Sequence, residues 1–77
     1  MYAIVDIETT GGYASAHGIT EIAVYVHDGH RVVRHFETLV NPYQNIPKYI
    51  TALTGIDNSM VANAPSFDDI AESLFEL

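Results

Sequence analysis

The chain has 77 residues, with 10 acidic and 3 basic side chains, a net charge of −7 and no cysteine. This length allows one small domain, and the absence of cysteine excludes a disulfide framework or a thiolate metal site. The acidic balance argues against a segment that holds nucleic acid through its own charge, because phosphate binding normally uses a Lys/Arg surface. No basic leader with an apolar run opens the chain and no apolar stretch reaches about 18 residues, so we expect a cytoplasmic protein without a membrane segment.

The first predicted element is a buried strand over residues 2–8, apolar up to the acids Asp6 and Glu8. Because side chains alternate along a strand, the two acids share one face, roughly 7 Å apart. Two such carboxylates repel each other and lose hydration, and a divalent cation between them reverses that cost. Hard oxygen ligands suit Mg²⁺ or Mn²⁺, and the spacing can serve two ions about 4 Å apart. The alternative is a solvated strand edge, which the apolar character of the strand disfavours.

Two more strands are predicted after a glycine-containing loop at 9–18. Residues 19–27 are β-branched and aromatic, which indicates a strand. Asp28-Gly29 predicts a two-residue hairpin turn, and residues 30–40 form the third strand. Apolar and polar residues occur on both faces of this third strand, so its inward face stays open.

Short helices are predicted in the second half of the chain. Pro47 can open a helix that runs through Leu53, with Gly55 as its left-handed cap. A further turn over 57–62 begins at Asp57 or Asn58. The last helix follows Ser66, a good N-cap, and places Asp68 and Asp69 in its first turn. The predicted order is β-β-β-α-α.

The stretch Asp6-Ile7-Glu8-Thr9-Thr10-Gly11 resembles the first motif of the DEDD (DnaQ-like) 3′→5′ exonucleases. That superfamily includes the epsilon proofreading subunit of bacterial DNA polymerase III. The resemblance continues in order through residues 19–23, 39–42, 46–47, 50–56 and 61–67, and so covers nearly the whole chain.

The resemblance implies a ribonuclease-H-like α/β fold, of which this chain is a β-β-β-α-α portion. It also implies hydrolysis of the 3′-terminal phosphodiester with two Mg²⁺ or Mn²⁺ ions. Asp6 matches the aspartate expected to bridge the ions, and Glu8 matches the glutamate expected to hold the ion that activates water. Thr9, Thr10 and Gly11 match the turn that contacts the terminal nucleotide, partly through backbone N–H groups.

The partner that the resemblance implies is the 3′ end of a nucleic acid, with DNA favoured over RNA, and a polymerase subunit or fused domain is a second partner. The family's second aspartate, its last aspartate and its general base have no match in this chain. We therefore expect residues 1–77 to be the N-terminal part of a single exonuclease domain, truncated before the second motif and inactive alone. The family's second aspartate lies in a motif of the form Asn-x-x-Phe-Asp, and Asp68 ends a similar run that begins at Asn63. That run is one residue too long, so we interpret Asp68 as a first-turn acid of a helix.

Other polar and aromatic residues have simpler interpretations. Glu21 can orient a metal-bound water, but a solvated strand carboxylate is favoured. Tyr13 can stack on a base, whereas the remaining histidines and tyrosines are interpreted as loop, surface or packing residues: His17, His27, His30, His35, Tyr25, Tyr43 and Tyr49. Two alternatives to an exonuclease stay open, a non-catalytic interaction module with the same fold and an acidic divalent-cation-binding domain. DNA versus RNA, proofreading versus repair or RNA processing, and the oligomeric state also stay open.

Overall fold

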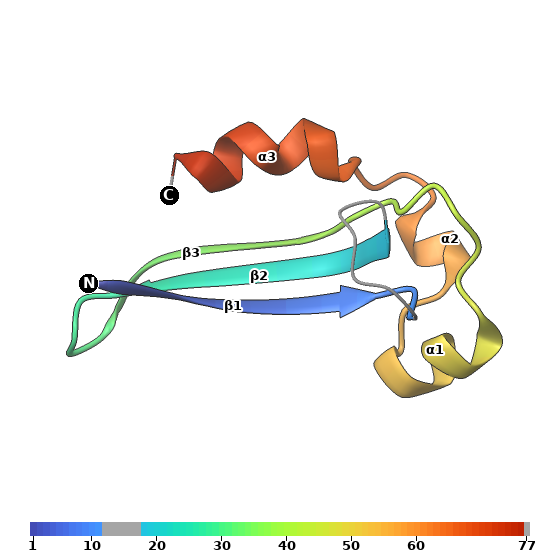
Figure 1. Ribbon diagram of the computed structural model, residues 1–77, viewed down its shortest axis with the longest axis horizontal. Helices are drawn as coiled ribbons and strands as arrows, with labels where there is room; N and C mark the ends of the chain where they lie inside the picture. The colour runs from blue at the N-terminus through green and yellow to red at the C-terminus, as the bar shows by residue number, and fades with distance from the viewer. Residues whose placement is uncertain (12–17, 77) are drawn as a thin grey trace.

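The computed structural model describes residues 1–11 and 18–76, which form an α/β arrangement (Figure 1). Three strands come first, β1 (Tyr2–Thr9), β2 (Ile19–His27) and β3 (Val32–Leu39). Three helices follow, α1 (Lys48–Thr54), α2 (Asn58–Val61) and α3 (Phe67–Phe75). The predicted order is therefore confirmed, and the turn expected over 57–62 is the short helix α2.

The three strands form one antiparallel sheet in the order β1-β2-β3. A register irregularity between Glu8 and Thr9 falls where β1 ends, beside the two acids. Directly paired residues of neighbouring strands project on the same face. This register defines a carboxylate face, which carries Tyr2, Ile4, Asp6 and Glu8 of β1, Glu21, Ala23, Tyr25 and His27 of β2, and His35 and Glu37 of β3.

The β2–β3 connection is a four-residue loop, Asp28 to Arg31, so the predicted two-residue turn at Asp28-Gly29 is wrong. The Asp28 carboxylate accepts hydrogen bonds from the backbone N–H groups of His30 at 2.8 Å and Arg31 at 3.0 Å. These bonds lower the pKa of Asp28. The Asp28 side chain thus stabilises a longer turn, in which Gly29 adopts a positive φ of 105°.

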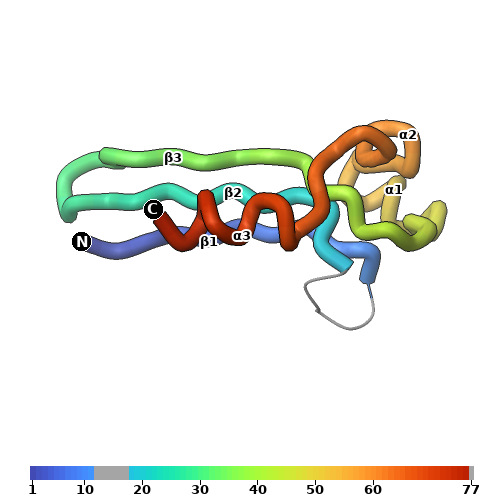
Figure 2. Tube along the Cα trace, turned by 90° about the horizontal axis from the view of Figure 1, so that it is seen from above, coloured from blue at the N-terminus to red at the C-terminus, as the bar shows by residue number. Residues whose placement is uncertain are grey.

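The face opposite the carboxylate face packs against α3 (Figures 1 and 2). Ile70 of α3 is buried in a cluster of strand residues, with three partly buried side chains at its border. The cluster contains Ile19, Ile22, Val24, Val40 and Ile70, bordered by Phe36, Phe67 and Leu74. Phe36 therefore settles which side of β3 faces inward. The predicted Ser66 cap of α3 is confirmed, since Ser66 and Asp69 form a reciprocal capping box.

A second apolar cluster holds α1 and α2 beyond the end of the sheet. Its buried members are Ile46, Ile50, Ile56 and Val61. Gly55 ends α1 in the left-handed conformation, with φ 80°, and Asp57 caps α2 by accepting from the Met60 N–H, so both predicted caps are confirmed. This cluster fixes α1 next to the turn that follows β1.

Strand β1 is exposed along most of its length in the described structure, contrary to the predicted buried strand. Among the described strands it pairs only with β2, and the buried cluster that packs against α3 contains no residue of β1. The apolar composition of β1 was the basis of the prediction, but burial depends on neighbours that composition does not specify.

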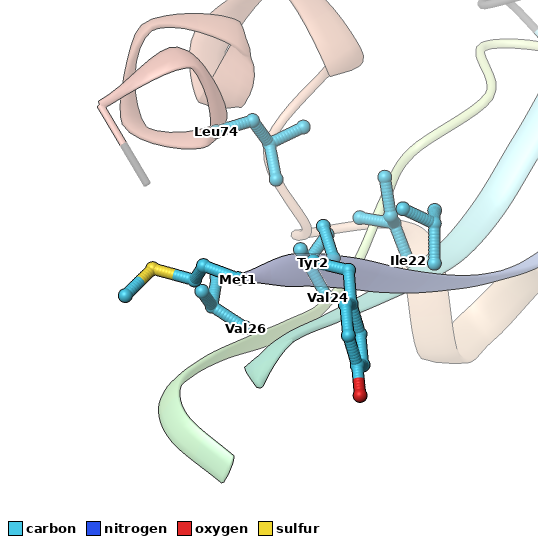
Figure 3. A pocket seen from close by; sticks show the side chains of 8 residues that line it. Met1, Tyr2, Ile22, Val24, Val26 and Leu74 are labelled. Carbon is cyan, nitrogen blue, oxygen red and sulfur yellow. The ribbon is translucent and has the colours of Figure 1, made fainter. Parts of the chain in front are cut away.

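An apolar cavity of about 510 Å³ lies between β1, β2 and the C-terminal part of α3 (Figure 3). Its walls include Ala3, Val5 and Val24, from the face of the sheet opposite the carboxylate face, and Leu74 of α3. The cavity is therefore on the opposite face from Asp6 and Glu8. Among the described residues, none of the helices has the length and apolar character needed to cross a membrane.

Candidate active site

The two acids of the first motif lie together on the carboxylate face, at the C-terminal end of β1. Asp6 pairs with Ala23 and Glu8 pairs with Glu21, so both side chains project on this face. The Asp6 residue is exposed and the Glu8 residue is half-buried. Neither carboxylate is hydrogen-bonded to a residue within 1–11 or 18–76. Their oxygens are therefore open to a ligand from solvent.

Glu21 brings a third carboxylate to the same end of the face. Its side chain is half-buried rather than fully solvated, which differs from the interpretation favoured by the sequence. Burial raises the pKa of Glu21, and the carboxylates of Glu37, Glu8 and Asp6 raise it further. These carboxylates are therefore close enough for their negative charges to act on one another.

The described residues contain no group of three or more His, Cys, Asp or Glu side chains arranged to hold a metal ion. The donors present, two carboxylates on one strand face, fit a hard divalent cation in their chemistry. A cation at Asp6 and Glu8 would also offset the repulsion that raises the pKa of Glu21. Metal binding by Asp6 and Glu8 stays a prediction.

The turn after Glu8 is held by hydrogen bonds within the chain. Thr10 is buried, its N–H donates to the Gly18 carbonyl at 2.7 Å, and its hydroxyl donates to the Gln44 side-chain carbonyl at 3.4 Å. The Gly11 N–H donates to the Thr9 hydroxyl at 3.1 Å. The N–H groups of Thr10 and Gly11 therefore stabilise the turn. Contact of Thr9, Thr10 or Gly11 with a terminal nucleotide stays a prediction.

Helix α1 also packs against this turn. The sequence patterns did not indicate this contact. Gly11 has φ 89°, and a Cβ atom at Gly11 would lie 2.7 Å from Ile50 Cδ1 and 3.3 Å from the Tyr49 hydroxyl oxygen. The absence of a side chain at Gly11 thus allows α1 to approach the turn closely. Gly11 in the motif was the sequence signal for a close contact at this turn. Which element makes that contact, here α1, depends on tertiary structure.

Aromatic pairs occupy the carboxylate face farther from the acids. Tyr25 stacks on His35 with ring centroids 4.8 Å apart, and Tyr2 stacks on His27 at 5.5 Å. The Tyr25 hydroxyl donates to Glu37 Oε2 at 3.3 Å. Packing is therefore the role of Tyr25, as predicted.

Tyr43 and Tyr49 are not packing residues, because they are 75% and 68% exposed. On α1 it is the adjacent Ile50 that enters the core, and this directs Tyr49 to solvent. His30 and His35 are exposed, as predicted, and His27 is partly buried. Asp68 lies in the first turn of α3, also as predicted. Tyr13 and His17 lie outside the described residues.

Comparisons with known proteins place this geometry in context. The exonuclease family model (RNase_T) matches residues 3–77. The 3′-5′ exonuclease DinG of Bacillus subtilis (strain 168) is 36% identical over 77 residues, and a PolC-type DNA polymerase III of Caldanaerobacter subterraneus subsp. tengcongensis is 40% identical over 75 residues. Among solved structures, Exonuclease X in complex with 5′ overhanging duplex DNA superposes with a TM-score of 0.81 at 31% identity.

These matches cover nearly all of this chain but only part of each relative. They include 99% of the chain and 8% of DinG, 97% of the chain and 5% of the polymerase, and 96% of the chain and 43% of Exonuclease X. The similarity therefore concerns one segment of much longer proteins, and that segment contains Asp6, Glu8 and the turn that follows them.

Proposed function

The chain belongs to the exonuclease (RNase_T) family, and from this premise we propose that its D-x-E pair is part of the active site of a 3′→5′ exonuclease acting on DNA. The observation that carries the proposal is the position of Asp6 and Glu8. They share one sheet face at the end of β1, in a segment whose fold superposes on Exonuclease X with a TM-score of 0.81. Exonucleases of this family generally use divalent metal ions.

In this proposal Asp6 and Glu8 are the residues of this chain that would hold the divalent ions, in the roles that the resemblance implies. Mg²⁺ or Mn²⁺, when bound, supplies a more acidic water and offsets charge on the phosphoryl group and the leaving oxygen. The chain contributes the rigid placement of these carboxylates. The β1–β2 ladder fixes their backbone, and the turn braced by Thr10 and α1 fixes the end of the strand.

We further propose that the remaining carboxylates and the general base come from residues outside 1–77. The described residues offer no third ligand in position, which is consistent with a site that other segments complete. The activity is then a property of the longer protein rather than of these 77 residues.

DNA is the proposed substrate because two relatives bear names that mention DNA. One is a PolC-type DNA polymerase III, and the other is Exonuclease X in complex with duplex DNA. The first also supports a proposed association with a polymerase. Repair and RNA processing compete with proofreading as its role, and a preference for RNA over DNA would favour RNA processing.

The proposal is tested with the full-length protein and the nearly isosteric variants Asp6→Asn and Glu8→Gln, which remove one charge each. We expect each variant to lose at least about a hundredfold in the hydrolysis rate of an oligonucleotide, as for a lost metal ligand. Glu72→Gln is the matched control, because Glu72 is an exposed acid on α3, across the sheet from the site.

Removal of divalent ions with EDTA should abolish hydrolysis in the wild type, and Mg²⁺ or Mn²⁺ should restore it. Full activity in EDTA, or equal activity of Asp6→Asn and Glu72→Gln, would contradict the proposed metal-dependent site. Binding of Mn²⁺ without any hydrolysis would instead support the acidic cation-binding alternative.

A further inference from the structure

Tyr49 is an exposed aromatic side chain beside the motif turn. It lies on α1, is 68% exposed, and its hydroxyl oxygen is 3.3 Å from the position of a Cβ at Gly11. No hydrogen bond joins the Tyr49 side chain to any residue of the described ranges. Since Ile50 anchors α1 in the second apolar cluster, the backbone that carries Tyr49 is held in place.

Helix α1 lies at the end of the molecule where β1 finishes, on the opposite side of the sheet from α3 (Figure 1). Helix α3 packs on the face opposite the carboxylate face. Since α1 lies on the other side of the sheet from α3, it is on the side toward which the carboxylate face points. Tyr49 and the acids Asp6 and Glu8 therefore belong to the same end and the same side of the fold.

Electrostatics alone give this end of the chain little attraction for a nucleic acid. The chain has 3 basic residues among its 77, and two of them, Arg31 and Arg34, lie at the hairpin end of the sheet. Lys48 is the one that lies on α1. Stacking of a base on an aromatic ring needs no positive charge, so an exposed ring can contribute to binding at this end of the chain.

We propose that the Tyr49 ring is a stacking platform for a base near the 3′ end of a single-stranded substrate. This inference rests on the proposed exonuclease function and adds a residue that holds the strand while its terminal phosphodiester lies at Asp6 and Glu8. The ring supplies the contact, so phenylalanine can replace tyrosine at this position whereas alanine cannot.

The experiment measures binding and hydrolysis by the full-length protein with a fluorescent single-stranded oligonucleotide. Binding is followed by fluorescence anisotropy in EDTA, so this measurement does not require an active enzyme. We expect Tyr49→Ala to raise Kd and KM at least about fivefold, with kcat within about twofold of the wild type. Tyr49→Phe should restore both constants to the wild-type range.

The matched control is Tyr43→Ala, because Tyr43 is a tyrosine of similar exposure, 75%, in the loop beside α3. The Kd of the Tyr43→Ala variant should equal that of the wild type. An unchanged Kd for Tyr49→Ala, or an equal rise for Tyr43→Ala, would overturn the inference. Absence of hydrolysis in the wild type and in every variant, with the Kd pattern intact, would contradict the exonuclease function and leave the stacking role standing.

Discussion

At the scale of single residues, the carboxylates of the site repel one another. Glu21 lies across the ladder from Glu8, and burial together with Glu37, Glu8 and Asp6 raises its pKa. The folded chain therefore holds the Glu21 proton to a higher pH than the unfolded chain does. Between these two pKa values the folded state binds more protons, so the free energy of unfolding falls as pH rises above the ordinary value of 4.5.

Substitution of Glu21 tests this charge accumulation. We expect Glu21→Gln to raise the melting temperature at pH 7 in EDTA, because the variant removes a carboxylate that is disfavoured in the folded state. The gain should disappear below pH 4.5, where wild-type Glu21 is protonated in both states. A melting-temperature difference that stays the same at pH 4 and pH 7 would show that charge is not the cause.

The sequence predicts the identity of the key acids but not all of their neighbours. Asp6 and Glu8 follow from their spacing in a strand, since alternation places them on one face. The proximity of Glu21 depends on the β1–β2 register, which pairs Glu8 with Glu21 just before the irregularity at Thr9. Spacing within one segment carries no information about that register.

At the scale of elements, the turn and α1 depend on two glycines with similar backbone conformations and different surroundings. Gly11 has φ 89° and lies against Ile50, whereas Gly55 has φ 80° and has no atom within 4 Å of the Cβ position. The two positions separate the backbone cost of a left-handed alanine from the cost of a steric clash.

We expect Gly55→Ala to reduce the free energy of unfolding by about 1 kcal/mol, the cost of a left-handed conformation. Gly11→Ala should cost about 1–3 kcal/mol more, because its Cβ would overlap the buried Ile50. Denaturant unfolding measures both values. Equal losses for the two variants would contradict the close contact between α1 and the motif turn.

Local chemistry predicts most of the elements, and it fails where longer-range structure decides. Ser66, Asp57 and Gly55 are the predicted helix boundaries because a cap acts within a few residues. The β2–β3 turn is longer than Asp28-Gly29 indicates, since the Asp28 side chain bonds to His30 and Arg31. The exposure of Tyr49 depends on which face of α1 joins the second apolar cluster.

At the scale of the whole molecule, β1 is the least covered element. Its edge away from β2 is unpaired among the described strands, and Ile4, Val5 and Ile7 are exposed. Strand β3 is the other edge, but it carries Arg34, His35 and Glu37, which discourage strand addition. The apolar edge of β1 is therefore the surface that another strand would cover.

Residues 1–77 produced alone should self-associate in a concentration-dependent way, because an apolar edge strand pairs readily with another chain. Val5→Lys should reduce this association, whereas Val33→Lys on β3 should leave it unchanged. Sedimentation velocity distinguishes these outcomes. A monomeric wild-type chain at all concentrations would show that the edge of β1 is protected.

The central claim is that Asp6 takes part in 3′→5′ hydrolysis, and the most direct measurement is digestion of a 5′-labelled single-stranded DNA by the full-length protein with Mg²⁺. The wild type should give a ladder of labelled products that shorten stepwise from the 3′ end. Asp6→Ala should give no ladder, with an unchanged far-ultraviolet circular dichroism spectrum, because the exposed Asp6 side chain bonds to no described residue. The same ladder from Asp6→Ala would contradict the claim.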